Sequence, residues 1–145
     1  MKTFLSQIFL STLILTNSVI SFSQNITDLG RKSYSDIKSM QKTEACEITI
    51  GKALTYCVED GSNITYIFKN NILNGIMFST PFSSKSEAEI ELKKEISAFS
   101  TKNRVSPYYM GGQALFRKED LPYKVSYGLQ DRSGTTYLVY YTFLE

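Results

Sequence analysis

The chain of 145 residues lacks histidine and tryptophan and has only two cysteines. Without histidine there is no Ser-His-Asp or Cys-His nucleophile, no imidazole general base near neutral pH and no imidazole metal ligand. Neither sign of charge is in large excess: the chain has 16 Lys+Arg against 14 Asp+Glu and a net charge of +2. This balance does not provide the concentrated basic surface that nucleic-acid binding requires. We therefore expect no nucleic-acid partner, no metal and no cofactor.

What the chain does have is the composition of a globular domain. Hydrophobic residues make up 42% of the sequence and charged residues 21%, which lies well away from the composition of disordered chains. We find no internal repeat, low-complexity segment or dividing linker. The sequence predicts one domain over residues 24–145.

The first 23 residues have the layout of a secretory signal peptide. Lys2 supplies a basic start, and an apolar stretch runs over residues 8–20. Ser21-Phe22-Ser23 then has small residues at the two positions that the peptidase must accommodate, which predicts a cut before Gln24. A retained anchor would need ~20 predominantly apolar residues, but Ser and Thr interrupt this stretch. No cysteine lies near the cut to accept a lipid. We expect an exported protein, periplasmic or secreted, with no stable membrane span after cleavage.

Export changes the interpretation of Cys46 and Cys57, because oxidising compartments favour disulfides. A hairpin turning about Gly51-Lys52 would place the two cysteines directly opposite each other, on the face of Ile48 and Thr55. The alternatives are two free buried thiols or a redox-active dithiol, which usually has a C-x-x-C spacing. The sequence predicts a structural Cys46–Cys57 disulfide.

Hydrophobic periodicity gives the remaining elements. Turn pairs at Asp60-Gly61 and Asn70-Asn71 divide β-prone runs, and the last hairpin would oppose Phe68 to Leu73, Tyr66 to Gly75 and Ile64 to Met77. A capping box at Ser84-Lys85-Ser86-Glu87 begins a helix. Its apolar stripe comprises Ala88, Leu92, Ile96 and Phe99. The predicted elements are a helix at 33–42, strands at 45–50, 53–59, 63–69 and 72–79, the second helix, and strands at 105–110, 114–117, 123–130 and 135–144.

This order predicts an α+β fold with an antiparallel sheet and helices on one face. The segment Leu29-Gly30-Arg31-Lys32-Ser33 before a short helix, followed by the strand-rich residues 64–71 and a helix, resembles small exported bacterial α+β proteins of unknown function. It is also similar to helix-then-meander modules of the envelope-assembly and β-lactamase-inhibitor type. The resemblance carries over no functional residue.

Carboxylates are the main acid–base groups left. Glu87, Glu91 and Glu95 follow one another at i,i+4 spacing and form an acidic ridge beside the apolar stripe; we interpret it as a solvated helix face rather than a partner or cation site. The adjacent pairs Glu59-Asp60 and Glu119-Asp120 are interpreted as turn residues rather than a catalytic dyad. Gly111-Gly112 is interpreted as a turn or bulge rather than an anion nest. No catalytic residue is therefore assigned.

Tyrosine is concentrated in the C-terminal half. On the final strand one side carries Tyr137, Val139, Tyr141 and Phe143 while Leu138, Tyr140 and Leu144 face the other way, so one apolar set must cover the core and the other must meet a helix, a partner or solvent. A strand of this kind could also pair edge to edge in a homodimer. The candidate interaction surface comprises Tyr108, Tyr109, Tyr123, Tyr127, Tyr137, Tyr140 and Tyr141.

We therefore predict an exported, non-catalytic protein that binds an unidentified protein or glycan through an exposed sheet face or the aromatic C-terminal hairpin. Two alternatives stay open. One is a carboxylate-dependent hydrolase of envelope or extracellular polymer, which would need carboxylates from separate elements to converge in a cleft. The other is an immunity or inhibitor protein.

Overall fold

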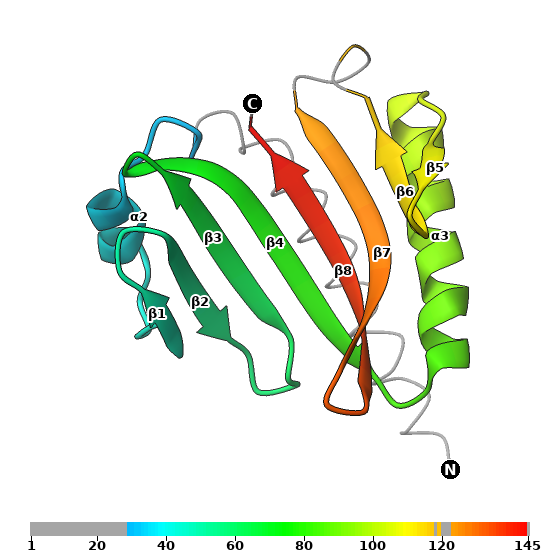
Figure 1. Cartoon of the computed structure of the whole chain (residues 1–145), viewed down its shortest axis with the longest axis horizontal. Coiled ribbons are helices and arrows are strands. Elements are labelled where there is room, and N and C mark those ends of the chain that lie inside the picture. The colour runs from blue at the N-terminus through cyan, green and yellow to red at the C-terminus, as the bar shows by residue number, and fades with distance from the viewer. Residues whose placement is uncertain (1–28, 118, 120–122, 145) are drawn as a thin grey trace.

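The computed structural model describes residues 29–117, 119 and 123–144 (Figure 1). The predicted signal peptide lies outside these residues. Within them, neither helix has the length and apolar character needed to cross a membrane.

The described chain is an α+β fold built on one eight-stranded antiparallel sheet, as predicted. Its spatial order is β1-β2-β3-β4-β8-β7-β6-β5. Figure 1 shows α2 and α3 beside opposite ends of this sheet. In chain order the elements are α2 (Tyr34–Met40), β1 (Glu47–Thr49), β2 (Ala53–Cys57), β3 (Asn63–Lys69), β4 (Ile72–Phe82), α3 (Lys85–Asn103), β5 (Tyr108–Met110), β6 (Gln113–Phe116), β7 (Lys124–Arg132) and β8 (Thr135–Phe143).

The element order repeats although the sequence has no repeat. A helix followed by a four-strand meander occurs twice, as α2 with β1–β4 and as α3 with β5–β8. The two meanders join in the middle of the sheet, where β4 pairs antiparallel with β8 over eight residue pairs from Gly75–Phe143 to Phe82–Thr136. The C-terminal strand therefore has both edges occupied, by β4 and by β7. An edge-to-edge contact would need one of these edges to be free, and homodimerisation itself stays a prediction.

Both helices begin at serine caps. The Ser84 side chain accepts a hydrogen bond from the Glu87 amide at 3.2 Å, which is one of the two hydrogen bonds of the capping box predicted there. Helix α2 has a complete capping box that was not predicted from the sequence. Its Ser33 side chain accepts from the Asp36 amide and the Asp36 carboxylate accepts from the Ser33 amide. These caps fix where the chain enters each helix and so how each helix meets the sheet.

One face of the sheet, here called the covered face, carries the core. A row of paired residues crosses it from Leu54 through Tyr66, Ile76, Thr142 and Val125 to Phe116, and all six are buried. From α3, Ala88, Ile96 and Phe99 are buried and Leu92 is partly buried, as the stripe predicts. Phe99 contacts Phe116 and Tyr127 with ring centroids 4.6 and 5.7 Å apart.

The short helix α2 covers the other end of the same face. Its Ile37 is buried, and Tyr34 meets Phe68 edge to face with centroids 5.2 Å apart. Gln41, just after the helix, donates a hydrogen bond to the Tyr66 hydroxyl. The prediction that helices cover one face is confirmed.

The β3–β4 register differs in part from the prediction. Phe68 opposes Leu73 as expected, but Tyr66 opposes Ile76 and Ile64 opposes Phe78. The reason is a bulge: the register shifts between Ile67 and Phe68, so β4 has one more residue than β3 at this point. Ile76 and Phe78 therefore face the core in place of Gly75 and Met77.

Candidate binding site on the open sheet face

The second face of the sheet, here called the open face, has neither described helix packed on it. On β8 it carries Tyr137, Val139, Tyr141 and Phe143, all partly exposed, while Thr136, Tyr140 and Thr142 between them are buried on the covered face. Strand alternation produces this division because successive side chains point to opposite faces. The predicted separation of two apolar sets on this strand is confirmed.

The neighbouring strands extend this apolar band. Tyr141 pairs with Met77 on β4 and with Ser126 on β7, and its ring lies 3.8 Å, centroid to centroid, from that of Phe143. Tyr108 at the β5 edge pairs with Leu115 of β6 and is 40% exposed. Partly exposed apolar side chains therefore lie along the centre of the open face, away from the two described helices.

The seven tyrosines proposed from sequence as one surface lie in three different places. Tyr108, Tyr137 and Tyr141 are on the open face. Tyr123, Tyr127 and Tyr140 are buried, at 6%, 2% and 5% exposure, so their assignment to an interaction surface is wrong. Tyr127 and Tyr140 lie on the covered face beneath α3, and burial raises the pKa of both hydroxyls above the usual tyrosine range. Tyr109 is 69% exposed and points from the β5 edge to the opposite side from Tyr108.

Arginines cover two of the open-face rings. The Arg132 guanidinium carbon lies 5.4 Å from the centroid of the Tyr137 ring, and that of Arg117 lies 5.1 Å from the Tyr108 ring. Both distances are within the range of cation–π attraction. Each arginine is thereby held over an aromatic surface rather than extended into water.

A polar hollow of about 230 Å³ lies at the β1–β4 end of the open face. Arg132, from the end of β7, reaches across Tyr137 to close one side of it. The hollow, called the threonine hollow below, is lined by Glu47, Thr49, Ala53, Thr55, Asn63, Thr65, Met77 and Arg132.

Strand pairing explains why these residues meet. Thr55 lies between Glu47 on β1 and Thr65 on β3, and Thr65 pairs in turn with Met77 on β4. The Thr55 and Thr65 hydroxyls share a hydrogen bond of 3.0 Å. The Arg132 guanidinium also donates a hydrogen bond to the side-chain oxygen of Gln130, and this bond adds to its contact with the Tyr137 ring.

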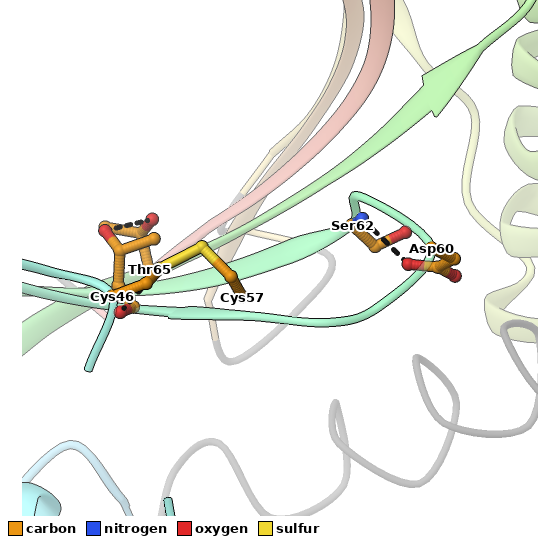
Figure 2. Close-up of a disulfide and its surroundings, with 6 residues drawn as sticks. Cys46, Cys57, Asp60, Ser62 and Thr65 are labelled. Carbon is orange, nitrogen blue, oxygen red and sulfur yellow. Dashed lines mark hydrogen bonds between the residues drawn. A yellow bond between two sulfur atoms is a disulfide. The ribbon is translucent and has the colours of Figure 1, made fainter. Parts of the chain in front are cut away.

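The Cys46–Cys57 disulfide borders the threonine hollow. Figure 2 shows it beside Thr65 on the β2–β3 ribbon, and the Cα atoms of the two cysteines are 5.9 Å apart. The predicted cross-link is therefore confirmed, but the predicted hairpin register is wrong by one residue. Glu47 pairs with Thr55 and Thr49 with Ala53, because Gly51 adopts a φ of 69° within a three-residue loop. Ile48 consequently lies opposite Leu54, on the other face from Thr55.

The acidic ridge of α3 is only in part a solvated face. Glu87 is exposed, but Glu91 is 16% exposed and is bridged to Lys94 at 3.0 Å. Glu95 is partly buried, and burial, helped by the neighbouring Glu91 charge, raises the pKa of its carboxyl. The prediction of a fully solvated ridge is wrong because Glu95 follows Leu92 by three residues and precedes Phe99 by four, which turns it toward the sheet.

The other candidate carboxylates lie on separate elements of the described chain. Asp60 accepts a hydrogen bond from the Ser62 amide at 2.8 Å and shapes the β2–β3 turn, as predicted for the Glu59-Asp60 pair (Figure 2). Glu119 is exposed and Asp120 lies outside the described residues. The threonine hollow contains one carboxylate, Glu47. No group of three potential metal ligands occurs within the described ranges.

Gly111 and Gly112 form the β5–β6 turn, with φ values of 59° and 79°. Both values lie in the left-handed region that glycine adopts most readily, and two such residues in a two-residue hairpin loop are typical of a type I′ turn. The turn interpretation of this pair is confirmed.

The threonine hollow was not predicted from the sequence. A weak signal was present, since Thr49, Thr55 and Thr65 occupy alternate strand positions together with Ala53 and Asn63. Arg132 lies beyond the predicted strand 123–130, whereas in the structure it is the last residue of β7, and the turn is formed by Ser133 and Gly134 at positive φ.

Comparisons with family models, curated proteins and solved structures found no match to this chain. The resemblance to small exported α+β proteins and to helix-then-meander modules therefore stays a prediction.

Proposed function

We propose that this protein is an exported, non-catalytic binding protein and that the open face is its binding surface. The observation that carries the proposal is the combination, on the sheet face that neither α2 nor α3 covers, of a central aromatic band and a preformed polar hollow. Antiparallel sheets usually place polar residues on such a face. Here β8 instead presents Tyr137, Val139, Tyr141 and Phe143.

The side chains of the open face also suit recognition. Tyrosine and arginine are the types most enriched at energetically dominant interface positions, and acidic residues are depleted there. The open face has Tyr108 and Tyr137 each covered by an arginine. Strand alternation places Lys69, Lys124, Arg132 and the acidic Glu47 on this face. Arg117, just after β6, lies over the Tyr108 ring on the same face.

The proposal of export rests on two features. The N-terminal segment has the layout of a signal peptide, and the Cys46–Cys57 disulfide suits an oxidising compartment. A cross-link at an exposed edge hairpin would be reduced in most cytosols.

The test is capture of partners from the envelope and extracellular fractions of the source cells, using the exported protein as bait. Tyr137→Ala removes a ring from the open face, and Ile90→Ala serves as the matched control because Ile90 is 54% exposed on α3. We expect the native protein and the Ile90 variant to retain the same partner, protein or glycan, and the Tyr137 variant to lose most of it. Equal capture by both variants would contradict the assignment to the open face.

A further inference from the structure

The threonine hollow has the size of a site for one small ring. Ligand pockets for drug-sized molecules occupy about 300–1,000 Å³, whereas this hollow measures about 230 Å³. It is also open to solvent at the surface of the sheet rather than enclosed in the core, since Thr49 and Glu47 at its rim are exposed. It therefore suits one residue of a longer chain, which can enter and leave across the rim.

Its polar groups define the hydrogen-bonding character of that residue. Arg132 can only donate and an ionised Glu47 can only accept, while the three threonine hydroxyls each do both and the Asn63 amide offers both donors and acceptors. One of the Thr55 and Thr65 hydroxyls donates its proton to the other. The proton of the accepting hydroxyl and several oxygen lone pairs therefore remain for hydrogen bonds to a ligand. A ligand with several groups that both donate and accept would match this set.

The charge of the hollow favours a neutral ligand. It contains one cation, Arg132, and one carboxylate, Glu47, so the lining has no net formal charge. An acidic group attracted to Arg132 would also be repelled by the Glu47 carboxylate, and this repulsion would weaken its binding. Ala53 and Met77 add apolar contact to the polar groups, which suits a ring that has hydroxyls at its edge and C–H groups on its face.

We propose that the threonine hollow binds one neutral sugar residue of a glycan; this inference rests on the proposed binding function of the open face. Vicinal sugar hydroxyls donate and accept at once, as the lining requires. The neighbouring rings of Tyr137 and Tyr141 provide aromatic surface for the next sugars of the chain. Arg132 is held over Tyr137 and by Gln130 before any ligand arrives, so little side-chain freedom is lost on binding.

The experiment is a titration of the ¹⁵N-labelled, disulfide-bonded exported protein with neutral oligosaccharides. Chitotetraose, cellotetraose and maltotetraose serve as probes, with tetragalacturonate as the acidic comparison. At least one neutral probe should shift the amide signals of Thr49, Thr55 and Thr65. Arg132→Gln and Asn63→Leu should each weaken that binding about five- to tenfold, the loss expected for one hydrogen bond to a charged or amide group. Thr101→Val, at an exposed position on α3, is the control and should bind as the native protein does.

The outcomes separate this inference from the proposed function. Preferential binding of tetragalacturonate, or shifts that avoid the hollow, would overturn the neutral-sugar assignment. If no saccharide binds while the open face captures a protein partner that Tyr137→Ala loses, the inference is wrong and the proposed function stands. If neither a saccharide nor a captured partner depends on the open face, both are wrong.

Discussion

At Gly75 the open face lacks a side chain, and the ring of Tyr141 occupies the vacant space. A Cβ atom added at residue 75 would lie 2.7 Å from the Tyr141 hydroxyl oxygen, 2.8 Å from its Cε2 and 3.1 Å from the Thr142 carbonyl oxygen. These distances are shorter than ordinary van der Waals contacts. Glycine at this strand position therefore determines where one ring of the aromatic band lies.

Gly75→Ala should lower the free energy of unfolding by about 1–3 kcal/mol, the usual cost of overpacking. Part of this loss should be recovered when Tyr141→Ala is added, because the second change removes the ring that the methyl group meets. Denaturant unfolding of the four proteins in this double-mutant cycle measures the coupling. If the effects of the two substitutions on the unfolding free energy are additive, the contact between residue 75 and the Tyr141 ring is contradicted. We expect Tyr141→Ala to recover only part of the loss, because the added methyl group still meets the Thr142 carbonyl oxygen.

Glu95 makes stability depend on pH in the less common direction for a carboxyl group. Its pKa is raised above the usual glutamate value, by burial first and by the Glu91 charge second. The folded state therefore binds this proton more tightly than the unfolded state, and stability is lost as pH rises from the unfolded pKa through the folded pKa. The ionised carboxylate at neutral pH thus opposes folding.

Glu95→Gln should raise the thermal midpoint at pH 7.5 and have a smaller effect at pH 4, where the native carboxyl is largely protonated. Scanning calorimetry at both pH values measures the difference. The control is Glu89→Gln, at an exposed position on the same helix, which should leave the pH dependence unchanged. If Glu95→Gln instead lowers the thermal midpoint equally at both pH values, burial of the Glu95 charge does not cause the pH dependence of stability.

Residue identity alone did not predict which tyrosines reach the surface. Tyr140 and Tyr141 are neighbours in β8, yet Tyr140 is buried beneath α3 and Tyr141 lies on the open face. Alternation separates them into two sets but does not say which set the helices cover. That choice depends on α3, whose Phe99 packs on Phe116 and Tyr127, residues distant in the sequence.

Among the elements, the β1–β2 hairpin shows what spacing can predict. Cys46 and Cys57 were expected to meet because turn residues lie midway between them, and they do. The register was not predicted, since a two-residue and a three-residue loop both bring the cysteines within disulfide reach, and the conformation of Gly51 decides between them. The bulge in β4 is a similar case, because one extra residue leaves no distinct mark in an apolar run.

Removal of the disulfide by Cys46→Ala together with Cys57→Ala should cost about 2–3 kcal/mol of unfolding free energy, given the short loop that it closes, with a sequence separation of 11. Chemical denaturation with and without reductant measures the loss in the native protein, and the double variant should not respond to reductant. Because Cys57 adjoins Asn63 across β2–β3, sugar binding in the threonine hollow should weaken as well. A reduced protein with unchanged stability would contradict a structural role for the cross-link.

In the whole molecule, the two helix-and-meander halves meet at β4 and β8, and this arrangement places the candidate site. Arg132 from the second half closes a hollow whose other walls come from β1–β4 in the first. The local patterns predicted most strands and both helices of the described chain, but no local pattern predicts that β8 inserts beside β4. The hollow depends on that long-range pairing, and for this reason it was not predicted from the sequence.

The same arrangement predicts how the molecule opens. β4 and β8 are paired on both sides and β8 lies beneath α3, whereas β1 and β5 are three-residue edge strands with exposed side chains. Amides at the centre of the β4–β8 ladder should exchange with solvent only through global unfolding, which costs about 5–15 kcal/mol in small domains, and the β1 and β5 amides should exchange through local fraying. Hydrogen exchange followed by NMR measures this order.

Reduction of the disulfide should accelerate exchange in β1 more than in β5, because Cys46 and Cys57 tie only the first edge. Equal acceleration at the two edges would mean that the cross-link stabilises the fold as a whole rather than the wall of the threonine hollow.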